Sequence, residues 1–151
     1  MPGEQVCVEI TENVLLGDVA KFTTALAGLR QLGVRSALDD IGTGFSNLAR
    51  LRDVPVDAIK VDRTLVTGVA NDRRAQAIVL ALVRLAHDLG IELIAEGVEN
   101  DADADALVRL GCLRAQGHGI ARPMDVASLV PLLDRGVIDL RHDPAAQMID
   151  S

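Results

Sequence analysis

Short apolar segments alternate with longer segments of helical periodicity along most of the chain, and this order constrains the fold more than any other feature. A strand, a helix and a second strand in succession form a right-handed unit whose two strands run parallel. The sequence therefore predicts an α/β fold. The predicted strands span residues 6–11, 34–38, 58–61 and 92–95, with 113–116 as a candidate fifth, and the predicted helices span 19–32, 72–89, 101–110 and 126–134.

The length of the chain limits how this pattern closes. A complete barrel of eight strand–helix units needs about 250 residues, whereas this chain has 151. We therefore expect an incomplete TIM-like (β/α) barrel of about five parallel strands. Two helices show a clear apolar face by spacing. These faces consist of Val19, Phe22, Leu26, Leu29 and Leu32 in the first helix, and of Ile78, Leu82, Leu85 and Leu89 in the second.

Composition limits the classes of function. The formal net charge is −7, and the aromatic residues are two phenylalanines with no Trp or Tyr. Binding to DNA or RNA is not expected, because it relies on a basic face or on aromatic stacking. No apolar run approaches the roughly 20 residues that span a bilayer, and no signal peptide is visible. Cys7 and Cys112 lie in apolar runs and are predicted to be buried free thiols, so a cytoplasmic location fits.

Acidic residues stand at the carboxyl ends of four predicted strands, where parallel α/β folds bind their ligands. They are Glu9, Asp39, Asp40, Asp62, Glu96 and Glu99. A lone acidic pair is more often a solvated loop or a helix cap, but several carboxylates in one mouth repel one another unless cations neutralise them. Such oxygen ligands suit Mg²⁺, Mn²⁺ or Ca²⁺. Two such ions roughly 3.5–4 Å apart would form a site for phosphodiester cleavage.

Further polar residues have the chemistry to act beside such ions. Alternation places Lys60 and Asp62 on the same side of a strand. There Lys60 either orients a water or a phosphate oxygen, or simply balances charge. Glu96 could ligate a metal or take a proton from the attacking water. Gln116 could hydrogen-bond a base or a water, and Glu99 fits a supporting or helix N-terminal position better than a ligand position.

Five motifs in a fixed order carry a family resemblance. They are EITE, DDIGTGFSNL, PVDAIKVDR, LGIELIAEGVEN and LGCLRAQGHGIARP, within about residues 6–124. Together they closely resemble the EAL domain, a family of bacterial cyclic-di-GMP phosphodiesterases with a modified TIM-like barrel. Five linked motifs are far more specific than one short signature. The resemblance implies a signalling hydrolase that uses Mg²⁺ or Mn²⁺ and acts on cyclic-di-GMP.

The resemblance also implies a role for each motif residue. The metal site would consist of Glu9, Asp39, Asp40 and Asp62, with Asp39 bridging two ions and Asp62 also supporting the lysine. The catalytic residues would be Lys60 at the water or scissile phosphate, Glu96 binding or activating water, and Gln116 hydrogen-bonding nearby. The supporting residues would be Glu12, which braces the loop of Gly42, Thr43 and Gly44, and Glu99.

The sequence departs from the family pattern in ways that affect activity. The Glu-Ala-Leu motif, whose glutamate binds metal, is absent, and so is the metal-binding asparagine of the following strand. Both belong to strands that would precede EITE. The chain therefore looks like the C-terminal five-eighths of an EAL barrel, with residues 1–136 as a partial domain and 137–151 as a loose tail. Ile41 and His118 replace residues that are usually aromatic.

An incomplete barrel has consequences for the isolated chain. We expect two open sheet edges and an exposed barrel-interior face rich in Val, Ile, Leu and Ala. Open edges and apolar patches favour association. The chain alone is therefore expected to be oligomeric, aggregated or partly molten, with early hydrogen exchange at residues 6–10.

The leading interpretation is a cyclic-di-GMP phosphodiesterase domain that forms pGpG by two-metal hydrolysis and is weak or inactive in this chain alone. The alternatives are a catalytically inactive EAL-like module that binds a nucleotide or protein partner in signalling, and a non-functional remnant. Possible partners are a second copy of the chain, or upstream sensory or GGDEF domains if the chain is a fragment. No membrane contact is expected.

Overall fold

A computed structural model of the chain describes residues 2–11, 13, 17, 19–42 and 48–134. Its five strands form one parallel sheet in sequence order. They are β1 (Cys7–Thr11), β2 (Arg35–Ile41), β3 (Ala58–Val61), β4 (Glu92–Ala95) and β5 (Arg114–Ala115). The predicted α/β fold with about five parallel strands is confirmed, and the candidate fifth strand is real but only two residues long.

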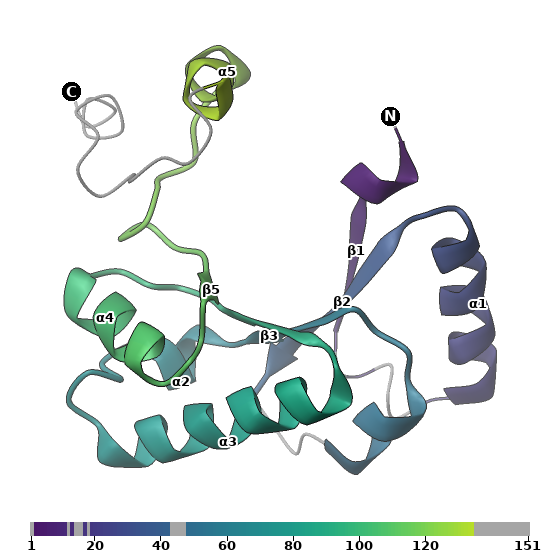
Figure 1. Cartoon of the computed structure of the whole chain (residues 1–151), viewed down its shortest axis with the longest axis horizontal. Coiled ribbons are helices and arrows are strands. Elements are labelled where there is room, and N and C mark those ends of the chain that lie inside the picture. Colours follow the sequence, from purple (N-terminus) through teal and green to yellow (C-terminus); the bar gives the residue numbers. More distant parts are fainter. Residues whose placement is uncertain (1, 12, 14–16, 18, 43–47, 135–151) are drawn as a thin grey trace.

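Helices fill the connections between the strands. In chain order they are the 3-10 helix η1 (Gly3–Gln5), α1 (Val19–Gln31), the 3-10 helix η3 (Leu48–Asp53), α2 (Arg63–Val66), α3 (Arg73–Leu89), α4 (Asp101–Arg109) and α5 (Val126–Asp134). The helices α1, α3 and α4 line one side of the curved sheet, and α5 stands apart from them (Figure 1). None of the described helices is long and apolar enough to cross a bilayer. The predicted tail, 137–151, lies outside the described residues.

The apolar core lies between the sheet and the helices on its outer side. Leu38 of β2 and Ile59 and Val61 of β3 are fully buried there. Val79 and Leu82 of α3 pack into the same cluster. Because side chains alternate along a strand, the residues between these point to the opposite, inner face of the sheet.

The inner face of the sheet is charged, which corrects the prediction of a face rich in Val, Ile, Leu and Ala. Arg35 Nη2 lies 2.8 Å from Glu92 Oε2, and Arg114 Nη2 lies 3.1 Å from Glu92 Oε1. This Arg35–Glu92 pair spans β3, where Ala58, the register partner of Glu92, has a small side chain. Lys60 and Glu9 form a further ion pair on this face. These pairs join β1 to β3 and β2 to β4 and β5.

The buried faces of the helices differ from the spacing-based expectation. On α3 the buried residues are Ala75, Val79, Leu82 and Ala86, whereas Ile78 and Leu89 are 46% and 38% exposed. Alanines at the contact let the helix approach the sheet closely, and the spacing of large apolar residues gives no sign of them. On α1, Leu26 is buried, whereas Leu32 is 71% exposed because it lies beyond the end of the helix.

Two further expectations need correction. Cys112 is a buried free thiol as predicted, but Cys7 is exposed. Cys7 lies on the edge strand β1, at the register position of Arg35 on the inner face. The strand β2 also continues past the predicted end at 38 to Ile41, so Asp39 and Asp40 belong to the strand rather than to a following loop.

Candidate metal centre

Lys60 forms the centre of the polar cluster on the inner face. All four residues of β3 are buried, and Ile59 and Val61 fill the core on the outer side. The side chain of Lys60 is 5% exposed, and its Nζ lies 2.8 Å from Glu9 Oε1, 2.5 Å from Glu96 Oε1 and 3.4 Å from Asp39 Oδ1. Residues of β1, of β2 and of the segment directly after β4 therefore place carboxylates around one buried ammonium group.

Asp39 and Asp40 both reach this mouth because the backbone of β2 is irregular between them. Consecutive residues of a regular strand point to opposite faces. Here Asp40 has a left-handed φ of 64°, and the pairing of β2 with β3 shifts register between Leu38 and Ile41. The Asp40 N–H donates to Asp39 Oδ1 at 3.0 Å. The kink thus turns two adjacent carboxylates towards the same space.

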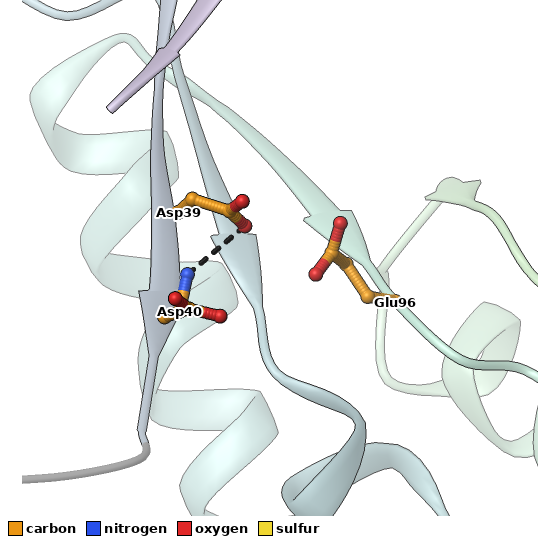
Figure 2. Close-up of side chains that lie close together, drawn as sticks. All are labelled: Asp39, Asp40 and Glu96. Carbon is orange, nitrogen blue, oxygen red and sulfur yellow. Dashed lines mark hydrogen bonds between the residues drawn. The ribbon is translucent and has the colours of Figure 1, made fainter. Parts of the chain in front are cut away.

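Glu96, directly after β4, completes a group of three carboxylates. One oxygen from each of Asp39, Asp40 and Glu96 lies within 4.8 Å of the other two. Figure 2 shows the two aspartates on β2 and Glu96 on the segment that follows β4, across the intervening β3, with their carboxylates turned towards the same space. A carboxylate-only donor set of this size fits a hard divalent cation such as Mg²⁺, Mn²⁺ or Ca²⁺.

The electrostatics of this cluster follow from burial and close pairing. Burial by itself would lower the pKa of Lys60, but its hydrogen bonds to Glu9 and Glu96 outweigh burial and raise it. Burial raises the pKa of Glu96, and the hydrogen bond and charge of Lys60 only partly offset this. The lysine is therefore firmly cationic.

Gln116, directly after β5, supports the cluster. Its Nε2 donates to Glu96 Oε1 at 2.6 Å, so the same oxygen accepts from Gln116 and from Lys60. The backbones of the two loops are also joined, since Val98 N–H donates to Gln116 O at 3.1 Å and Gly119 N–H donates to Val98 O at 2.8 Å. Gln116 thus fixes the orientation of Glu96 rather than facing the aspartates directly.

Two predicted site residues lie outside the group of three. Glu9 contacts the cluster through Lys60. Asp62 caps the short helix α2, where its Oδ1 accepts from Thr64 N–H at 2.9 Å. Burial would raise the pKa of Asp62, but hydrogen bonds from Thr64 and Arg63 lower it. In the sequence, an aspartate just before a short segment without helix-breaking residues is the sign of such a cap.

A cavity of about 460 Å³ opens beside Gln116 and Gly97. Its lining includes Glu99, which was predicted as a supporting residue, and His118, which replaces a residue that is usually aromatic in the family. It also includes Arg63 and Arg122, for which the sequence predicted no role. Gly42 of the predicted supporting loop lies next to Leu65 with a φ of 111°. The remaining loop predictions, Glu12, Thr43 and Gly44, fall outside the described residues.

Comparison with known proteins agrees with this arrangement. The family model for the EAL domain matches residues 1–123. The chain belongs to the EAL domain family. It is 43% identical over 124 residues to the cyclic di-GMP phosphodiesterase RocR of Pseudomonas aeruginosa, an alignment that covers 82% of this chain and 32% of RocR.

Solved EAL structures share the fold. The EAL domain of Mycobacterium smegmatis DcpA superposes with a TM-score of 0.85 at 40% identity, covering 91% of this chain and 62% of that one. A manganese and cyclic-di-GMP complex of Klebsiella pneumoniae BlrP1 gives a TM-score of 0.76 at 37% identity, covering 82% and 31%. This EAL chain therefore spans less than two thirds of each of these relatives.

Proposed function

We propose that this EAL chain is a unit of a cyclic-di-GMP phosphodiesterase, which opens one phosphodiester of the cyclic dinucleotide to give pGpG. The observation that carries the proposal is the convergence of Asp39, Asp40 and Glu96 around a buried lysine at the carboxyl ends of the strands. RocR and BlrP1 support it, because the former is named a cyclic di-GMP phosphodiesterase and the latter was solved with the dinucleotide and manganese.

In this proposal the residues of the chain divide the work. Asp39, Asp40 and Glu96 hold Mg²⁺ or Mn²⁺, which when bound would polarise the phosphate and acidify the attacking water. Lys60 offsets the negative charge that develops on the phosphate. Gln116 keeps Glu96 in position through its 2.6 Å hydrogen bond. Glu9 keeps its Oε1 on Lys60 and offers its second carboxylate oxygen as a further ligand. Asp62 braces β3 by capping α2.

The neighbouring cavity supplies room for part of the substrate. Its volume of about 460 Å³ falls within the range of roughly 300–1,000 Å³ of small-molecule sites. Arg63 and Arg122 are among its lining residues and bring positive charge towards an anionic ligand. We propose that one nucleotide half of the dinucleotide lies here, with its phosphate towards Glu96.

We further propose that the 151-residue chain turns over slowly on its own. The described residues bring together three carboxylates, whereas two hard cations with about six oxygen ligands each need a larger shell. Residues 1–136 form the domain in this proposal. Further domains or a second copy would complete and regulate it in the bacterial cytoplasm.

The test is release of pGpG from cyclic-di-GMP at high protein concentration, with Mg²⁺ and with Mn²⁺, followed by chromatography. We expect slow, metal-dependent release that Asp40→Asn abolishes and that Asp88→Asn, on the exposed side of α3, leaves unchanged. Calorimetry with the dinucleotide runs in parallel. Binding without any release would replace the enzyme proposal by that of a binding module, and neither binding nor release would refute both.

A further inference from the structure

The ammonium group of Lys60 already offsets part of the negative charge of the carboxylates that a divalent cation would use. It lies within ion-pair distance of Glu9, Asp39 and Glu96, and the latter two belong to the candidate metal group. The side chain of Lys60 is 5% exposed, so its charge is little screened by solvent. Part of the charge of these carboxylates is therefore compensated from within the protein.

We infer that Lys60 is a built-in counter-ion that competes with divalent cations for this mouth and thereby sets how tightly the chain binds metal. The inference rests on the metal site of the proposed function. Glu96 Oε1 accepts from both Lys60 and Gln116, and Asp39 Oδ1 accepts from the Asp40 N–H and faces Lys60. An entering cation finds one oxygen of each carboxylate already engaged, and it meets a like charge only a few ångströms away.

The exposed fractions of the three carboxylates that contact Lys60 indicate how the competition proceeds. The side chain of Glu9 is 51% exposed, whereas those of Asp39 and Glu96 are 22% and 17% exposed. Asp39 and Glu96 are held from both sides, so they remain in the mouth when a cation enters. Glu9 is the partner with room to move, and Lys60 keeps it as a counter-charge while its contacts to Asp39 and Glu96 lengthen.

The chain offers a matched pair of variants for the test, because it contains only two lysines, Lys21 and Lys60. Mn²⁺ and Mg²⁺ are titrated calorimetrically into the full chain and into Lys60→Met and Lys21→Met. Removing one unit of nearby like charge is expected to tighten Mn²⁺ binding by Lys60→Met about tenfold or more. Lys21→Met should match the wild type.

Several results would overturn the inference. Weaker or unchanged metal binding by Lys60→Met would mean that the lysine holds the ligands in place instead of opposing the cation. Absence of binding in both the wild type and Lys60→Met would show that the lysine is not what limits metal entry. A large heat that is equal in all three proteins would place the metal elsewhere.

A second measurement decides the matter if Lys60→Met fails to fold. Wild-type chain with ¹³C- and ¹⁵N-labelled lysine gives one set of side-chain signals from each of the two lysines. Addition of diamagnetic Mg²⁺ should shift the Nζ and Cε signals of Lys60 and leave those of Lys21 in place. Unchanged Lys60 signals throughout the titration would refute the competition.

Neither readout requires turnover, so the inference and the proposed function fail separately. A chain whose metal binding responds to Lys60→Met but which releases no pGpG would refute the phosphodiesterase proposal and leave the counter-ion role intact. If the chain releases pGpG but Lys60→Met does not tighten metal binding, the counter-ion role is refuted and the phosphodiesterase proposal stands.

Discussion

At the scale of single residues, the conformation of Asp40 decides whether two adjacent carboxylates can share a site. Its φ of 64° is one that residues with a side chain seldom adopt, and within the described part of the chain no other non-glycine residue has a positive φ. Aspartate tolerates this region better than most residues. The sequence shows Asp39 and Asp40 as neighbours, but it does not show the left-handed kink, which arises from the register shift between β2 and β3.

The backbone at Asp40 can be tested apart from its charge. Asp40→Val and Asp40→Gly both remove the carboxylate, but only glycine adopts a positive φ without strain. We expect Asp40→Val to have a free energy of unfolding about 1 kcal/mol or more below that of Asp40→Gly, because a β-branched side chain clashes in the left-handed region. Urea unfolding of the two variants measures this difference. Equal midpoints and slopes would show that Asp40 is not held in this conformation.

At the scale of elements, a buried carboxylate joins the α2–α3 loop to helix α4. Asp103 is 2% exposed, and it accepts from Gly68 N–H and Ala70 N–H at 2.9 Å each. Asn100 Nδ2 donates to the same carboxylate. Burial alone would raise the pKa of Asp103, but these backbone and side-chain donors lower it below its ordinary value of 3.8.

Replacing Asp103 by Asn turns one acceptor into a donor that faces backbone N–H groups. We expect Asp103→Asn to lose about 2 kcal/mol or more of unfolding free energy at pH 7, the range of hydrogen bonds to charged groups. Because the pKa of Asp103 is lowered in the folded state, this stabilisation is present above its unfolded value of 3.8. It is lost as the pH falls through the lowered folded value.

Chemical unfolding of the wild type, Asp103→Asn and Asp105→Asn between pH 7 and pH 2.5 tests this expectation. Asp105 lies on the exposed side of the same helix and serves as the matched control. The difference in free energy of unfolding between the wild type and Asp103→Asn should become smaller as the pH falls below about 4. A difference in unfolding free energy that stays constant from pH 7 to pH 2.5 would argue against a charged Asp103.

The loops that follow β4 and β5 hold Glu96 and Gln116 together, and Gly117 permits their close approach. Gly117 has a φ of 153°, and a Cβ built on it would lie 2.3 Å from both N and O of Val98. Gly90, at the end of α3, also has a positive φ, of 68°, but nothing lies within 4 Å of its Cβ position. Both glycines therefore have a positive φ, but only Gly117 lacks the space for a side chain.

Alanine substitutions separate these two demands. Gly90→Ala should cost about 1 kcal/mol of unfolding free energy from backbone strain alone. Gly117→Ala should cost about 1–3 kcal/mol more, because the added methyl group forces the two loops apart. Thermal and urea unfolding compare the variants. If Gly117→Ala is no less stable than Gly90→Ala, the close contact with Val98 is not maintained in solution.

Sequence reasoning succeeds where local pattern and local structure coincide. The segments 58–61, 92–95 and 126–134 were predicted to the residue, because turn and breaker residues bound them. Features that depend on a neighbouring element were missed. Which residues of α3 are buried depends on how the helix packs against the sheet. The four-residue α2 depends on the cap at Asp62. The attachment of Glu9 to Lys60 requires knowledge of how three strands are arranged.

At the scale of the whole molecule, the sheet has one charged face, and within the described residues its edge strands β1 and β5 each pair with a strand on one side only. Ion pairs join Arg35 to Glu92 and Lys60 to Glu9 on the inner face, so that face gives little apolar area for association. The edges are different. Val6 O accepts from Arg35 N–H, and the groups of successive residues alternate in direction. The backbone groups of Cys7 and Glu9 therefore point away from β2, along the free edge of β1.

We expect the 151-residue chain to self-associate through this edge of β1, because unpaired backbone groups on an edge strand pair readily with another chain. Cys7→Pro should abolish the association, since proline lacks the N–H that faces outward at this position. Cys7→Ser keeps that N–H and removes only the thiol, which makes it the matched control. Size-exclusion chromatography with light scattering, in the presence of a reductant, should give an oligomer for Cys7→Ser and a monomer for Cys7→Pro.

High salt should leave the oligomer intact, because backbone hydrogen bonds hold it together. Dissociation in salt would assign the contact to the charged inner face instead. A monomeric Cys7→Ser at all concentrations would show that the edge of β1 is protected.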